Sequence, residues 1–189
     1  MTLSDIEETR KAASDAFKRH DYDLALSLSI ELSRYNVPEA LFTCGLIYER
    51  LKGKMDLEKS YTYYDRLRKY DLVEGSNGCV RVILKKGAHS EAAKAEQYCL
   101  MAMKEDGSPL ARLLLGRVLE ELCQPPDLHR AKKLYLEAAL HGRPWGYRRF
   151  ANIKIREGHK VVGILIHIIT TLIFPFYVLI LGNKALQAG

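Results

Sequence analysis

The pattern of apolar and polar residues along the chain predicts a succession of short amphipathic helices. Apolar residues recur three or four positions apart, as in Leu114, Val118 and Leu122, which is the spacing of one buried helix face. Prolines, glycines and aspartates interrupt the pattern where one helix would end and the next begin. We therefore expect an all-α protein. The clearest predicted helices cover about 38–50, 56–70, 108–122 and 127–140.

The helical pattern also repeats along the chain. A shift of 71 residues superimposes identical residues without a gap: Gly45 on Gly116, Glu49 on Glu120, Asp56 on Asp127, Leu57 on Leu128, and Tyr64 on Tyr135. Half of that step falls in the range of helical solenoids, in which each period is a pair of helices. Acidic residues mark this half-step at Asp21, Asp56, Glu91 and Asp127. The sequence thus predicts an α-solenoid of about four to five helix-turn-helix repeats.

Small residues hold fixed places in this register. One follows four positions after each of the acidic residues, and a glycine occupies the first helix of two of the periods. A small side chain lets a neighbouring helix approach closely, so we expect these positions to pack the repeats together. The predicted packing residues are Ala25, Gly45, Ser60, Ala95, Gly116 and Ala131.

Two of the periods resemble Sel1-like repeats, which are relatives of tetratricopeptide repeats. Residues 40–49 are A-L-F-T-C-G-L-I-Y-E and residues 111–120 are A-R-L-L-L-G-R-V-L-E, as in the first helix of that family; residues 127–142, D-L-H-R-A-K-K-L-Y-L-E-A-A-L-H-G, match its second helix. The other periods match loosely and the loops are short, so a tetratricopeptide-type repeat stays open. The resemblance covers about 5–157. It implies a protein-binding superhelix with no catalytic residues.

A different pattern begins at Val161, where 21 residues to Leu181 carry no formal charge. As a helix rising ~1.5 Å per residue the run would be about 31 Å long, which matches the hydrocarbon core of a bilayer. A buried core helix of the repeat stack is the alternative. The expected organisation is a repeat domain over 1–157, a membrane helix with a basic N-terminal flank over 158–182, and a short tail over 183–189.

The distribution of charge supports a membrane location. The chain has a net charge of +6, yet residues 1–142 hold 22 basic and 22 acidic residues. The excess lies beside the apolar run, and all but Lys184 of these basic residues precede it. The positive-inside rule then predicts a single-pass protein with cytoplasmic repeats. A bacterial inner membrane is favoured because Sel1-like repeats are widespread in bacteria; a eukaryotic organelle membrane is the alternative.

The sequence offers little that predicts catalysis. We find no phosphate-binding loop, no dinucleotide motif and no hydrolase motif. The four cysteines stand apart and no histidines cluster beside them, so no metal site and no cofactor are expected. The balanced charge of residues 1–142 argues against a nucleic-acid surface. We expect neither an enzyme nor a small-molecule substrate.

Arginines on the first helices of the repeats suggest a binding surface. They recur 36 residues apart, and first helices would line the concave face of a solenoid. Such a row could bind an acidic or phosphorylated protein partner, because the guanidinium group pairs with carboxylate and phosphate in bidentate fashion. Scattered solvent-facing arginines are the alternative. The predicted row consists of Arg81, Arg112, Arg117 and Arg148.

These observations predict a membrane-anchored scaffold or adaptor that binds protein partners through its repeats. The alternative is an accessory subunit of a membrane enzyme or transport complex, for example in envelope polysaccharide assembly, that contacts the complex through its membrane helix. His167, a polar residue inside the apolar run, would favour the alternative if it faced another protein.

Overall fold

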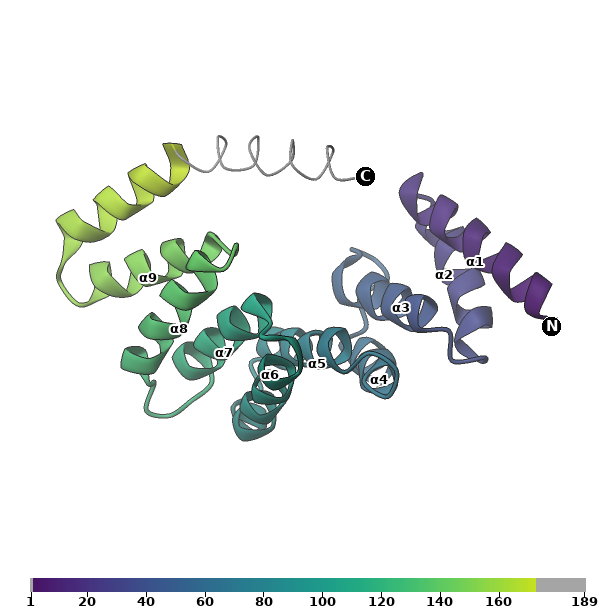
Figure 1. Cartoon of the computed structure of the whole chain (residues 1–189), viewed down its shortest axis with the longest axis horizontal. Helices are drawn as coiled ribbons and strands as arrows, with labels where there is room; N and C mark the ends of the chain where they lie inside the picture. Colours follow the sequence, from purple (N-terminus) through teal and green to yellow (C-terminus); the bar gives the residue numbers. More distant parts are fainter. Residues whose placement is uncertain (1, 173–189) are drawn as a thin grey trace. The chain divides into compact units, whose positions relative to one another are not determined.

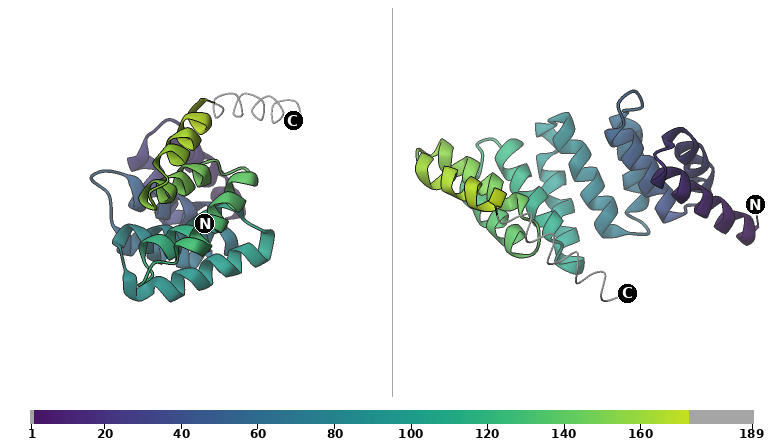
Figure 2. Two further views of the ribbon diagram at one scale, coloured as in Figure 1. Left: turned by 90° about the vertical axis from the view of Figure 1, so that its left-hand side faces the viewer. Right: turned by 90° about the horizontal axis from the view of Figure 1, so that it is seen from above.

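The computed structural model describes residues 2–172, and its secondary structure over those residues is helical throughout, with no strand. This confirms the prediction of an all-α protein. The chain divides into two compact units, residues 1–108 and residues 109–189, and each unit is described by itself. Figure 1 shows the helices in chain order, and Figure 2 gives two further views.

Unit 1 is built from antiparallel helices that follow one another along the chain. Each α-helix packs against the next one, and α3 also contacts α5. This contact across an intervening helix brings first helices of the predicted periods together. The elements of unit 1 are α1 (Leu3–Lys18), α2 (Tyr22–Ser33), α3 (Pro38–Arg50), α4 (Leu57–Leu67), α5 (Leu72–Lys86), the 3-10 turn η1 (His89–Glu91) and α6 (Ala92–Asp106).

Unit 2 contains α7 (Pro109–Glu121), α8 (Leu128–Leu140) and α9 (Trp145–Arg156), followed after a turn by a helix over residues 160–172. Helix α8 packs against both α7 and α9. The division after Ser108 falls inside the predicted repeat domain 1–157. Residues 160–172, which were expected to belong to a separate membrane segment, are part of the same unit as α7 to α9.

Aspartates begin the second helix of several periods. The carboxylates of Asp21, Asp56 and Asp127 each accept a hydrogen bond from the backbone N–H three residues later. Such a cap satisfies a donor that the first turn of a helix leaves unpaired. Glu91 does not cap a helix in this way, because it lies in the 3-10 turn that precedes α6. Asp71 is an N-cap that the register did not predict, and it starts α5 at Leu72.

One close contact recurs in both units at the 71-residue step. A Cβ atom added to Gly45 of α3 would lie 2.7 Å from the ring of Tyr64, and one added to Gly116 of α7 would lie 2.6 Å from the ring of Tyr135. Both tyrosines are fully buried. The glycine is therefore needed at each position, because any side chain there would collide with the ring that packs α4 on α3 or α8 on α7.

The other predicted packing residues also lie in the interior. Ala25, Ser60, Ala95 and Ala131 have no exposed surface. The Ser60 hydroxyl donates a hydrogen bond of 2.8 Å to the carbonyl of Gly45, so the serine in this small position is also satisfied.

The predicted membrane segment lies only partly within the described residues. Its first twelve residues belong to the helix over 160–172, and residues 173–181 and the tail 183–189 lie outside the description. Among the helices of residues 2–172, none is both long and apolar enough to cross a membrane.

Candidate functional site

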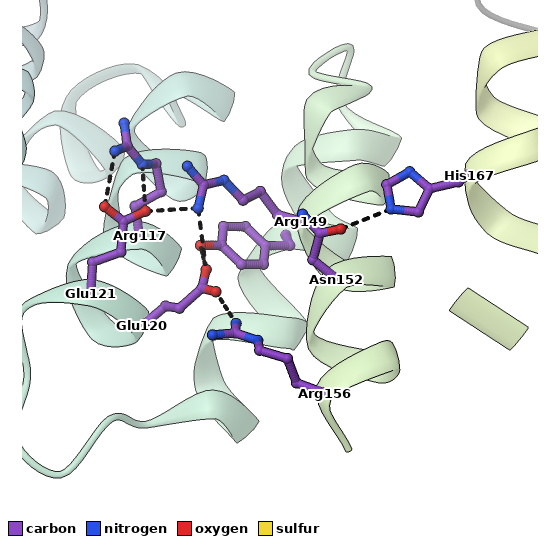
Figure 3. Close-up of polar contacts among 8 residues, drawn as sticks. Arg117, Glu120, Glu121, Arg149, Asn152, Arg156 and His167 are labelled. Atoms are coloured by element: carbon purple, nitrogen blue, oxygen red, sulfur yellow. Dashed lines mark hydrogen bonds and ion pairs between the residues drawn. The ribbon is translucent and has the colours of Figure 1, made fainter. Parts of the chain in front are cut away.

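A buried carboxylate organises the interior of unit 2. Glu120 of α7, whose side chain is 7% exposed, accepts a hydrogen bond of 2.5 Å from the Tyr135 hydroxyl. Arg149 lies 3.7 Å from the same carboxylate oxygen, and Arg156 pairs with the other oxygen (Figure 3). Both arginines come from α9, so the cluster ties α7, α8 and α9 together.

The neighbouring acid, Glu121, extends this cluster toward the surface. Arg117 holds its carboxylate with two hydrogen bonds of 3.0 Å each, and Arg149 adds a third of 2.7 Å (Figure 3). Partial burial opposes ionisation of Glu121. The hydrogen bond and charge of Arg117, with the charge of Arg149, outweigh burial and hold the pKa of Glu121 below its ordinary value of 4.5.

The same arrangement occurs in unit 1 at the 71-residue step. The Tyr64 hydroxyl donates to Glu49 at 2.9 Å, and Arg81 of α5 donates from Nε to both oxygens of Glu49 at 3.2 and 3.0 Å. A second nitrogen of Arg81 donates to the Tyr64 hydroxyl at 2.9 Å. In both units, then, an acid on one helix and a tyrosine on the next are joined by a cation from the helix after that.

The structure gives the four arginines of the predicted row different neighbours. Arg81 is an interior residue of unit 1, and Arg117 binds Glu121 in unit 2. Arg112 lies 3.8 Å from Glu137. Arg148 is exposed, and its guanidinium group lies 4.9 Å from the ring centre of Trp145.

His167 links the helix over 160–172 to α9. Its Nε2 lies 2.8 Å from Oδ1 of Asn152 (Figure 3). One turn earlier, a Cβ atom added to Gly163 would lie 2.4 Å from a side-chain carbon of Ile155 and 2.8 Å from the carbonyl of Ala151. The absence of a side chain at Gly163 thus permits the close packing of this helix on α9.

The opposite face of the helix over 160–172 is apolar and exposed. The residues on it are spaced three or four apart, as an exposed helix face requires. No formal charge occurs between 161 and 172, and Thr171 is the one exposed polar residue on this stretch. The exposed apolar residues are Val161, Val162, Ile164, Leu165, Ile168, Ile169 and Leu172; Val161 is 73% and Leu172 64% exposed. We call these seven residues the apolar face.

The six basic residues that precede the apolar run in the sequence separate into two groups. Three of them bind carboxylates of unit 2: Arg149 and Arg156 bind Glu120, and Lys154 binds Glu157. The other three are exposed, and within residues 2–172 no ion pair involves them: Arg143, Arg148 and Lys160. Sequence position alone could not separate the groups, because the carboxylates belong to other elements.

Unit 1 contains a hollow of about 530 Å³ between α1, α2 and α3. Small and apolar residues line part of it, among them Ala13, Leu32 and Ala40. At its rim Arg10 binds Glu7 at 2.7 Å and Glu39 at 3.0 Å. The Ser29 hydroxyl is buried against the hollow, and within the described residues it has no hydrogen-bond partner. The sequence pattern did not predict this site.

The remaining candidates for chemistry have structural surroundings. Cys44 and Cys79 are buried, and burial raises the pKa of each thiol to about 12, so neither is a thiolate at neutral pH. Over residues 2–172 no group of three or more histidine, cysteine or acidic side chains is placed to hold a metal ion. No family model matches the chain, and no curated protein matches it.

Proposed function

We propose that this chain is a membrane-anchored scaffold that binds protein partners through its helical repeats. The observation that carries the proposal is the apolar face of the helix over 160–172. Large contiguous apolar surfaces are rare on soluble monomers and are typical of membrane or protein contacts. In the sequence this face continues into residues 173–181, which also lack charge.

The length of the uncharged run favours a membrane-spanning helix as the final anchored state. All 21 residues from 161 to 181 are needed to cover a hydrocarbon core of ~30 Å. The first part of the run cannot span while it lies on α9, because α9 carries Arg149, Lys154 and Arg156 and would be drawn into the lipid. The proposal therefore includes separation of the helix from α9 when the anchor inserts, with the repeats on the cytoplasmic side.

The helical pairs supply the scaffold. The glycine–tyrosine contact and the Glu–Tyr–Arg cluster repeat at a 71-residue step, which supports a stack of Sel1-like or tetratricopeptide-type repeats. The predicted acidic or phosphorylated partner would have to displace Glu49 from Arg81 and Glu121 from Arg117. We place partner binding at the hollow between α1, α2 and α3 instead, where the Ser29 hydroxyl would gain a hydrogen bond.

The alternative function, an accessory subunit that contacts a complex through the membrane helix, receives no specific support. His167 was the residue that would have favoured it. In the structure the imidazole already has a polar neighbour within the chain, Asn152.

Membrane fractionation tests the proposal. The full chain should stay in the membrane pellet after an alkaline wash, and a chain that ends at Lys160 should be released. The double variant Ile164→Asp, Ile168→Asp, which places two charges on the apolar face, should also be released. Leu24→Asp, Met55→Asp is the matched control, since it changes two exposed apolar residues of unit 1 and should remain in the pellet. Retention of the chain that ends at Lys160 would overturn the proposal.

A further inference from the structure

Three cations of unit 2 are free to bind an external anion. Arg143, Arg148 and Lys160 are exposed, and no ion pair within residues 2–172 involves them. Their neighbours in the sequence, such as Arg149 and Arg156, are already bound to Glu120. The free cations are therefore a subset selected by the fold, and they are the ones available at the surface.

These cations belong to the same pair of helices as the apolar face. Lys160 is the first residue of the helix over 160–172, next to Val161, the most exposed apolar residue on it. Arg143 and Arg148 lie near the start of α9, against which the other side of that helix packs through Gly163 and His167. Charge and apolar surface thus occur on a single helical hairpin.

Trp145 adds the third element of an interfacial site. Its ring is 57% exposed and carries the guanidinium group of Arg148 at 4.9 Å from the ring centre. Tryptophan favours the boundary between lipid and water, because its ring is apolar and its N–H is polar. Arginine binds phosphate oxygens in bidentate fashion, so the pair matches the headgroup depth of a phospholipid bilayer.

From this arrangement we infer that the hairpin of α9 and residues 160–172, in its packed form, docks on bilayers that contain anionic phospholipid. The inference rests on the proposed membrane anchoring and adds the class of lipid and the residues that select it. The apolar face lies in the plane of the bilayer at the headgroup–acyl boundary, as amphipathic helices do. Arg143, Arg148 and Lys160 bind the lipid phosphates. Because α9 covers only the other side of the helix, this docked state requires no unfolding.

The three cations set the size of the expected lipid preference. Each basic residue near an anionic membrane surface raises binding by roughly fivefold, so three raise it by about a hundredfold. The preference should fall at high salt, because exposed charges are screened within ~10 Å at moderate ionic strength. The contribution of the apolar face should not fall with salt.

Vesicle flotation with the full chain, diluted from detergent, tests the inference. Vesicles of phosphatidylcholine alone are compared with vesicles that also contain phosphatidylglycerol. The wild type should bind the anionic vesicles about a hundredfold more tightly. Arg143→Gln, Arg148→Gln, Lys160→Gln together should remove most of this preference and leave binding to phosphatidylcholine unchanged. The matched control replaces three exposed lysines of unit 1 by glutamine, Lys52, Lys69 and Lys104, and should keep the preference.

The possible results separate the two proposals. Equal binding of the wild type to both kinds of vesicle would overturn the headgroup inference and leave membrane anchoring standing. Failure to bind either kind would overturn both. Displacement from anionic vesicles by inorganic phosphate, at a concentration where sodium chloride of equal ionic strength has no effect, would assign the cations to a soluble phosphate ligand instead. Helical circular dichroism of the triple variant should match the wild type, since all three side chains are exposed.

Discussion

Replacing Arg81 by glutamine should strongly destabilise unit 1. The arginine side chain is 14% exposed and the Glu49 side chain that it binds is 7% exposed. Glutamine cannot neutralise that carboxylate, so the variant would leave a buried charge whose remaining described side-chain donor is the Tyr64 hydroxyl. If Arg81 were a solvent-facing member of a binding row, the same change would have almost no effect on stability.

The expected loss follows from the burial of the pair. Removing one partner of a buried ion pair costs about 3–5 kcal/mol. We expect the lower end, about 3 kcal/mol, because Tyr64 keeps one hydrogen bond to Glu49. For a protein of this size the loss lowers the midpoint of thermal unfolding by roughly 10 °C. Arg117→Gln should cost less than about 1 kcal/mol, since Arg117 and Glu121 are both partly exposed.

Thermal unfolding of the full chain in mild detergent, followed by circular dichroism, measures these differences. Glu49→Gln should also destabilise, but the double variant Arg81→Gln, Glu49→Gln should be more stable than Arg81→Gln alone, because it leaves no unpaired charge. An Arg81→Gln midpoint equal to that of the wild type would refute the reasoning. Arg81 would then be dispensable to the fold and available again for partner binding.

Two further predictions concern unit 2 and the repeat register. The folded pKa of Glu121 lies below 4.5, so its ion pairs stabilise the fold above that pH and this stability is lost as the pH falls through the folded pKa. In Glu121→Gln the unfolding midpoint should therefore depend less on pH below about 4.5 than in the wild type, and an equally steep dependence would contradict the assignment. Ala131 is fully buried, so Ala131→Leu should overpack unit 2 by about 1–3 kcal/mol in urea unfolding; an unchanged midpoint would place this residue elsewhere.

The sequence predicted the positions of many elements because local chemistry fixes them. Asp21, Asp56 and Asp127 start helices since a carboxylate three residues before a backbone N–H caps it wherever the helix packs. The identical residues at the 71-residue step were visible as well. That Gly45 and Tyr64 touch each other, rather than two separate neighbours, was not visible, since the contact joins two helices.

The arginines show why the candidate site was harder to predict. A spacing of 36 residues indicates equivalent positions in a repeat, but it does not indicate which side chains an arginine meets. Arg81 lies inside because Glu49, 32 residues earlier, is on a packed face of α3. One signal was present: Glu49 and Glu120 occupy the same place in two otherwise apolar helices. A conserved spacing of acid and tyrosine calls for a cation, which could have identified Arg81 as an interior residue.

His167 decides between the two placements proposed for the anchor. In the packed form its imidazole bonds to Asn152; in the spanning form it enters the lipid, where a polar group costs free energy unless it finds another partner. Asn152→Ala removes a contact from the packed form alone, while His167→Leu removes that contact and also the cost of insertion. Both should shift the chain toward the spanning form, His167→Leu the more.

Labelling of Ala188→Cys from the far side of the membrane measures the fraction of chains that span, provided that the four native cysteines are first replaced by serine or alanine. Gly163→Leu should act in the same direction, because a Cβ there would lie 2.4 Å from the Ile155 side chain and force the helix away from α9. Labelling from the far side that stays the same in Asn152→Ala, His167→Leu and Gly163→Leu would mean that packing on α9 does not compete with insertion. The membrane-bound chain would then keep the hairpin closed, and the apolar face alone would hold it at the bilayer surface.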